Sequence, residues 1–65
     1  MKVRVNGMEI EVNANTVEEL LKELDINPQR VVVEVNLDIV KRDRFSSYKI
    51  KDGDSIEIVN FVGGG

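Results

Sequence analysis

The first twelve residues alternate between apolar and polar side chains, and the pair Asn6-Gly7 interrupts this alternation at its centre. Asn-Gly is strongly preferred in two-residue type I′ turns, which join adjacent antiparallel strands. Such a turn places the apolar side chains on one face of the hairpin and the charged side chains on the other. The expected partners are Val5 with Met8, Val3 with Ile10, Met1 with Val12, Arg4 with Glu9 and Lys2 with Glu11. We therefore predict a β-hairpin over residues 1–12, with an apolar face and exposed ion pairs on the opposite face.

A helix start follows the hairpin. The Thr16 hydroxyl can cap a helix, and the Glu19 carboxylate can reach back as the second half of a capping box. Apolar residues then recur at the spacing of one helix face, at Val17, Leu20, Leu21 and Leu24. Asn27-Pro28 is expected to end the segment, because the residue before proline is disfavoured in the helical conformation. The pattern predicts a helix over residues 16–25 whose apolar stripe packs on the hairpin.

The second half of the chain contains two further runs typical of strands. Residues 31–35 are short and rich in valine, which favours a largely buried strand. Asp52-Gly53-Asp54 predicts a turn before a last strand over residues 55–61. Between these runs we expect a short strand at Ile39-Val40, a surface turn at residues 41–44, and a long connection anchored by Phe45, Tyr48 and Ile50. This order of elements predicts an α+β fold in which one helix packs across one mixed sheet.

The composition limits the kinds of site that such a domain can carry. The 65 residues suffice for one core, and they include no cysteine and no histidine. This excludes a thiolate nucleophile and removes the commonest general base and metal ligand, so we expect no metal site. The net charge of −3 disfavours nucleic-acid binding, and no apolar run approaches the ~18 residues that span a bilayer. We expect a cytoplasmic protein that works through protein partners rather than at a membrane.

Three groups of residues are candidates for a site. Asp52 and Asp54 are paired carboxylates, but turn formation explains both of them. Lys41, Arg42 and Arg44 fit either contact with an acidic partner or a solvated loop. The last group is the terminal glycines, which folding does not explain, because glycine loses the most entropy on ordering. These glycines are either an inert end or a peptide presented beside the outward face of the last strand, where Val59 and Phe61 are interface or ordinary core.

The sequence resembles the ThiS-type sulfur carriers of thiamine biosynthesis, which belong to the ubiquitin-like β-grasp superfamily. The resemblance rests on Asn6-Gly7, Thr16-Val17 with Leu20-Leu21, Val33-Glu34-Val35-Asn36, Ile39-Val40, Asp52-Gly53-Asp54-Ser55-Ile56-Glu57-Ile58-Val59 and Phe61-Val62-Gly63-Gly64-Gly65. It implies a β-grasp domain over residues 1–62 and a flexible glycine tail at 63–65. The sheet should be mixed and four- to five-stranded, with adjacent parallel first and last strands. One departure is Lys41, where family members often have proline before the arginine that matches Arg42.

The resemblance also implies a function for the terminal residues. The carboxylate of Gly65 would be adenylated by an E1-like enzyme that uses ATP and magnesium, and a persulfide donor would convert it to a thiocarboxylate. Thiazole synthase would then receive the sulfur for the thiazole ring of thiamine. Gly63 and Gly64 would thread into the partner, and the candidate docking residues are Val59, Phe61, Val62 and Arg42. The chain would be a co-substrate rather than an enzyme, without catalytic residues or a bound cofactor of its own.

Three other interpretations of the glycine end remain open at this point. The small subunit of molybdopterin synthase shares the thiocarboxylate chemistry, although that group usually runs longer. A ubiquitin-like modifier would instead form isopeptide bonds to lysines, and a simple interaction module would need no free carboxylate. Conjugates to other proteins would support the modifier, whereas tolerance of a C-terminal tag would support the interaction module.

Overall fold

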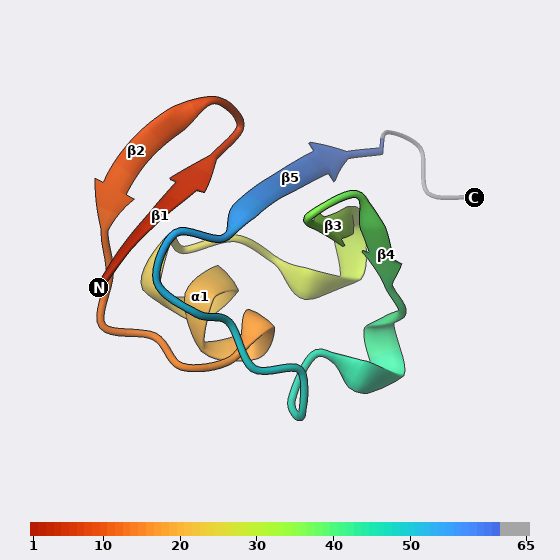
Figure 1. Cartoon of the computed structure of the whole chain (residues 1–65). Coiled ribbons are helices and arrows are strands. Elements are labelled where there is room, and N and C mark those ends of the chain that lie inside the picture. Colours follow the sequence, from red (N-terminus) through yellow and green to blue (C-terminus); the bar gives the residue numbers. More distant parts are fainter. Residues whose placement is uncertain (62–65) are drawn as a thin grey trace.

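Strand β5 (Ser55–Asn60) lies at the centre of a five-stranded mixed sheet, and one helix covers one face of that sheet (Figure 1). The computed structural model describes residues 1–61. The other elements are β1 (Lys2–Val5), β2 (Met8–Glu11), α1 (Val17–Glu23), β3 (Val31–Val35), β4 (Asp38–Val40) and the 3₁₀ turns η1 (Pro28–Arg30) and η2 (Arg42–Arg44). The strand order is β2-β1-β5-β3-β4, with β1 and β5 parallel. The predicted α+β fold, with adjacent parallel first and last strands, is confirmed.

The N-terminal hairpin has the predicted register. β1 pairs with β2 through Lys2–Glu11, Val3–Ile10, Arg4–Glu9 and Val5–Met8. Asn6 and Gly7 have φ angles of 50° and 84°, and a type I′ turn requires positive values at both positions. The predicted ion pairs across this hairpin are wrong: within residues 1–61, the only ion pair joins the Met1 ammonium to Glu11, at 3.0 Å. Exposed cross-strand charges gain little in water and lose side-chain entropy when they pair.

Helix α1 begins as predicted but ends earlier. The Thr16 hydroxyl accepts a hydrogen bond from the Glu19 amide at 3.2 Å, while the Glu19 carboxylate accepts from the Asn15 amide at 2.8 Å rather than from Thr16. Asp25, with a φ of 59°, ends the helix, and the Ile26 amide donates to the Leu21 carbonyl at 2.8 Å. This is a Schellman arrangement. The predicted termination at Asn27-Pro28 is therefore wrong, and that pair opens η1 instead.

The core lies between α1 and the facing side of the sheet. Val17, Leu20 and Leu21 are buried on the helix, and Phe45 and Ile50 anchor the long connection as predicted. Their buried partners in the sheet and the connecting segments are Val3, Val12, Ala14, Val31, Val33, Val35, Val40, Ile56 and Ile58. The alternation along β3 continues on the other side of the sheet, where Val32 is exposed and Glu34 half-buried. Within residues 1–61 no helix covers this second face of the sheet, which we call the open face.

Candidate functional site

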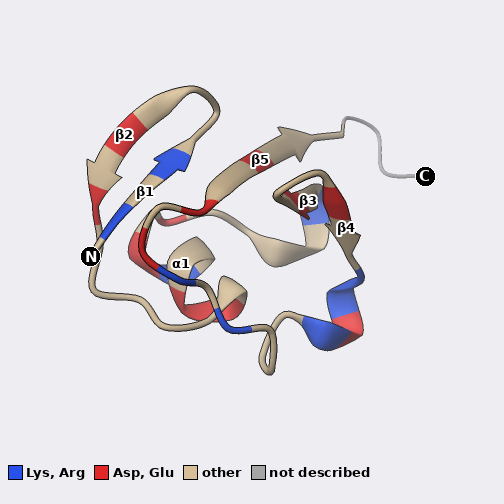
Figure 2. Cartoon of the chain, in the orientation of Figure 1, with Lys and Arg blue, Asp and Glu red and all other residues tan. Residues whose placement is uncertain are grey.

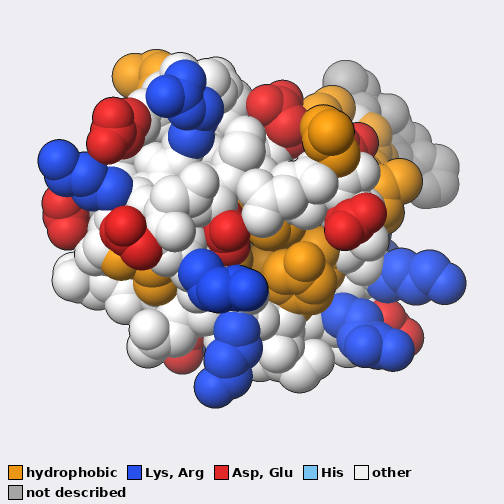
Figure 3. All heavy atoms as spheres, viewed as in Figure 1, with side chains coloured by type: hydrophobic (Ala, Val, Ile, Leu, Met, Phe, Trp, Pro, Cys, Tyr) orange, Lys and Arg blue, Asp and Glu red, His pale blue; other side chains and the backbone are white. Residues whose placement is uncertain are grey.

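The open face of the sheet carries an apolar patch at the end where β5 finishes. Ile56 and Ile58 point into the core, whereas Val59 is 57% exposed and Phe61 37% exposed. Val59 and Phe61 are therefore surface residues, which answers the question that the sequence left open. Val32 pairs directly with Val59, and Ile39 pairs with Glu34 on the same face. We call Val32, Ile39, Val59 and Phe61 the open-face patch, and Figure 3 shows hydrophobic side chains gathered at this edge of the molecule.

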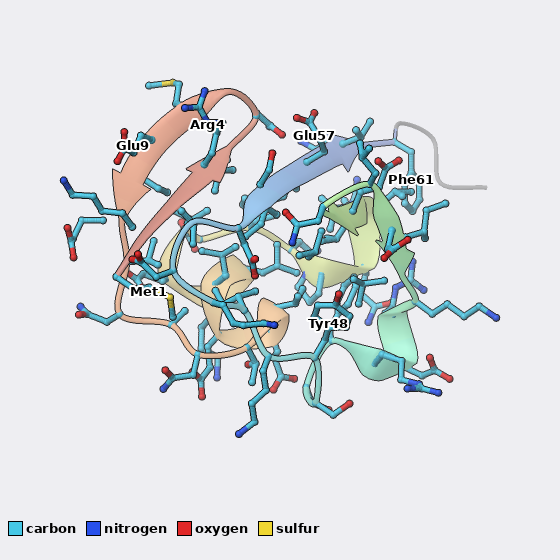
Figure 4. All side chains as sticks on the ribbon, in the orientation of Figure 1. Met1, Arg4, Glu9, Tyr48, Glu57 and Phe61 are labelled. Atoms are coloured by element: carbon cyan, nitrogen blue, oxygen red, sulfur yellow. The ribbon has the colours of Figure 1, made fainter. Side chains whose placement is uncertain are left out.

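The chain remains hydrogen-bonded to the neighbouring segment as far as Phe61, at the edge of this patch. Asn60 pairs with Val31, and the Phe61 amide donates to the Arg30 carbonyl at 3.0 Å. Figure 4 shows Phe61 just beyond the end of β5. The other predicted site residues of this segment, Val62, Gly63, Gly64 and Gly65, lie outside the described residues. The described structure thus establishes where that segment starts, beside the open-face patch.

Arg42 lies in η2, directly after β4. Its guanidinium is exposed and donates to the Gln29 carbonyl at 3.4 Å, so it links η2 to η1. Figure 2 shows that basic residues cluster along this turn. Lys41 precedes Arg42, and Arg44 ends the turn. A shallow hollow of about 250 Å³ lies between the turn and the sheet, lined by Ile39, Val40, Lys41, Arg44 and Tyr48. The structure therefore places Arg42 on the surface beside β4, with a structural contact of its own.

The carboxylates of Asp52 and Asp54 hold backbone groups of their turn and of the neighbouring strand. Asp54 is buried and accepts from the Lys51 amide at 2.7 Å, while Asp52 accepts from the Lys2 amide at 2.8 Å. These contacts support the interpretation that both residues shape the turn. In the part of the chain that the structure describes, no group of three His, Cys, Asp or Glu side chains is arranged to hold a metal ion. No helix in residues 1–61 is long and apolar enough to cross a membrane.

Two asparagine side chains, for which the sequence predicts no long-range hydrogen bond, hold β5 in place. The Asn6 side chain accepts from the Ile58 amide at 2.8 Å and donates to the Ile58 carbonyl at 3.1 Å. On the other side of β5, the Asn36 side chain accepts from the Ser55 amide at 3.0 Å. The sequence signal for Asn6 is its turn position, and formation of the turn accounts for that signal without any contact to β5. Both contacts keep the strand that leads to the open-face patch in a fixed register.

Comparison with known proteins supports a single family. The model of the ThiS family matches residues 3–65. The sulfur carrier protein ThiS of Bacillus subtilis is 34% identical over 65 residues, which cover 97% of this chain and 98% of that protein. A crystal structure of the thiamine biosynthesis protein ThiS from Geobacter metallireducens superposes with a TM-score of 0.86 at 36% identity, and the match covers 100% of both chains.

A second kind of relative is much longer. The thiazole synthase of Paramagnetospirillum magneticum is 46% identical over 66 residues, but this chain spans only 20% of the length of that protein. The matching region includes all of the present chain. The family model and the full-length relatives together cover the hairpin, the helix, the open-face patch and the glycines. By its sequence and its ubiquitin-like fold, this chain belongs to the ThiS family.

Proposed function

We propose that this chain is a sulfur carrier of thiamine biosynthesis, which carries sulfur as a thiocarboxylate at Gly65. The observation that supports this most directly is the geometry at the end of β5. The chain is tied to the sheet as far as Phe61, and it leaves beside an exposed apolar patch. A partner bound to that patch would be in position to take up the glycines that follow.

The proposed reaction uses the carboxylate of Gly65 as the reactant. On an E1-like partner with ATP and magnesium, this carboxylate attacks the α-phosphate, and pyrophosphate leaves. The terminal sulfur of a donor persulfide then displaces AMP to form an acyl disulfide, and a thiol reduces the S–S bond to release the thiocarboxylate. The chain offers neither an imidazole base nor a thiol to these steps, because it contains no histidine or cysteine. We therefore propose a co-substrate rather than an enzyme, with no cofactor of its own.

The partner would dock on the open-face patch. Val59 and Phe61 offer exposed apolar surface, and Val62 continues from them toward the glycines. Gly63 and Gly64 suit a narrow channel because they have no Cβ to obstruct it. Arg42 and its basic neighbours lie at the β4 side of the patch and would meet an acidic border of the partner. The match between this chain and a segment of thiazole synthases supports thiazole synthase as the sulfur acceptor.

The alternative that this chain is a small subunit of molybdopterin synthase is not favoured. The full-length relatives are a sulfur carrier protein ThiS and a thiamine biosynthesis protein ThiS, and the longer relatives are thiazole synthases. The same relatives give no support to a ubiquitin-like modifier or to a simple interaction module.

The experiment that tests the proposal uses the chain that ends at Gly65 and a variant that lacks only Gly65. Each is incubated with ATP, magnesium, a ThiS-activating enzyme, a persulfide donor and a thiol reductant, and intact-mass spectrometry follows the replacement of one oxygen by sulfur. We expect the full chain to gain sulfur and the variant to gain none, because its terminal carboxylate is displaced by one residue. A chain extended by one residue beyond Gly65 is the matched control and should be equally inactive. Sulfur gain by the shortened chain at the rate of the full chain would falsify the carrier proposal.

A further inference from the structure

Leu37 has an unfavourable backbone conformation. The β3–β4 turn consists of Asn36 and Leu37, whose φ angles are 51° and 75°. Asparagine tolerates this left-handed region, whereas a bulky side chain such as leucine rarely adopts it. The turn of the first hairpin also has positive φ angles at both positions, and there the second position is occupied by Gly7. Local conformation therefore favours glycine, and not leucine, at position 37.

Packing does not explain Leu37 either. Its side chain is 88% exposed, the highest value among the exposed large hydrophobic residues of the described chain. A single exposed leucine on an unstrained backbone needs no explanation. A strained backbone that carries an exposed apolar side chain is different, because strain at non-glycine positions collects at functional sites. Neither the fold nor its core benefits from leucine at this position.

The turn that carries Leu37 is held firmly. The Asn36 amide donates to the Ser55 carbonyl at 2.7 Å, and its side-chain oxygen accepts from the Ser55 amide at 3.0 Å. The Asn36 side chain also donates to the buried carboxylate of Asp54 at 2.9 Å. These bonds tie the turn to the start of β5. A side chain presented on such a fixed turn loses little conformational entropy when it binds.

The surroundings of Leu37 indicate the chemistry of its partner. Leu37 lies in the turn two residues before Ile39 of the open-face patch, beside the start of β5 and at the opposite end of the sheet from Phe61. Glu34 and Glu57 are directly opposed on the same face, and like charges in this position repel each other. Neither carboxylate forms an ion pair within residues 1–61. Figure 4 shows Glu57 on β5. Around Leu37 a complementary surface is therefore apolar with a basic border, whereas the acidic border of the partner would face Arg42 at the other end of β4.

We propose that Leu37 is an anchor that inserts into an apolar pocket of the partner that activates Gly65. Arginine or lysine side chains of that partner would border the pocket and face Glu34 and Glu57. This inference rests on the proposed function and adds to it that the contact runs along the whole open face, from Phe61 to the β3–β4 turn. A small number of well-buried side chains carries most of the binding energy of a protein interface.

The test measures ATP-dependent pyrophosphate release by the activating enzyme as a function of carrier concentration. For Leu37→Gly we expect KM to rise about tenfold with kcat unchanged, because the anchor is lost while Gly65 is intact. The melting temperature should stay the same or rise by up to about 5 °C, because glycine accepts a positive φ. Leu37→Asn also tolerates this φ and should raise KM equally. Leu37→Met should keep most of the affinity.

Two further variants test whether the effect is specific to Leu37 and whether the partner has a basic border. Met8→Ala removes another exposed apolar side chain, at the far hairpin, and should leave KM unchanged. Glu57→Lys would form a favourable pair with Glu34 in the free chain and should raise KM by repelling the basic border. An unchanged KM in Leu37→Gly and Leu37→Asn, with an active wild-type chain, would overturn the proposal that Leu37 is an anchor but not the proposed function. Absence of any pyrophosphate release with the wild-type chain overturns the proposed function instead.

Discussion

At the scale of single residues, Asn6 has two structural roles, one in the first turn and one at the last strand. Its φ of 50° helps to close the first hairpin, and its amide group pairs with both backbone groups of Ile58, which is 52 residues away in the sequence. The backbone bond from the Asn6 amide to the Ile56 carbonyl, at 2.9 Å, continues this ladder. The last strand is therefore held in register by the turn of the first hairpin.

Replacement of Asn6 by aspartate tests this second role. Asp-Gly also forms a type I′ turn, so the hairpin itself is retained. The new carboxylate can still accept from the Ile58 amide, but it has no hydrogen to donate to the Ile58 carbonyl. We expect Asn6→Asp to lower the free energy of unfolding by about 1–2 kcal/mol in urea denaturation. Asn60→Asp, at an exposed position, should change it by less than about 0.5 kcal/mol. Equal effects of the two variants would contradict the assignment.

At the scale of elements, helix α1 depends on its packing. Its seven residues are fewer than the ~12–15 that an isolated helix needs to be stable in water. Leu20 is fully buried beneath the sheet. We expect Leu20→Ala to lower the free energy of unfolding by about 2–5 kcal/mol, whereas Lys22→Ala on the exposed face should lower it by less than about 0.5 kcal/mol. Activity of Leu20→Ala should fall only in proportion to the folded fraction, which circular dichroism measures under the assay conditions. A low activity in fully folded protein would count against this account.

The end of the same helix offers a stabilising change. Asp25 has the left-handed conformation that most helices assign to glycine after their last turn. Asp25→Gly should raise the free energy of unfolding by up to about 1 kcal/mol, because the relief of backbone strain exceeds the added entropy of the unfolded chain. Asp25→Ala removes the same carboxylate without relieving the strain, and its stability should lie below that of the glycine variant. The reverse order in thermal melts would show that the Asp25 side chain, rather than its backbone, stabilises this end.

At the scale of the whole molecule, every buried apolar residue of the described chain lies between Val3 and Ile58. The radius of gyration of 10.9 Å is close to the ~11 Å expected for a compact chain of this length. Stability and the proposed chemistry therefore belong to different parts of the sequence. A chain that ends at Val62 should unfold within about 0.5 kcal/mol of the full chain, yet accept no sulfur. A large loss of stability in this shortened chain would contradict the division at residue 62, which remains a prediction.

The features that the sequence alone determined are those governed by neighbours along the chain. Turn chemistry at Asn6-Gly7 and the two-residue period of the strands determine the hairpin register, and Thr16 determines the start of the helix. The identity of the terminal glycines and their proposed chemistry are likewise read from the sequence alone.

The tertiary structure decided the features that depend on distant partners. The exposure of Val59 and Phe61 follows from the placement of α1 on the opposite face of the sheet, and a two-residue period cannot say which face the helix covers. The helix ends at Glu23 rather than just before Pro28, because a Schellman arrangement with Asp25 in the left-handed conformation satisfies the last carbonyl groups. The contact of Asn6 with Ile58 joins two strands that only the folded sheet brings together. Local patterns fix conformation over a few residues, whereas burial and long-range hydrogen bonds are properties of the assembled sheet and helix.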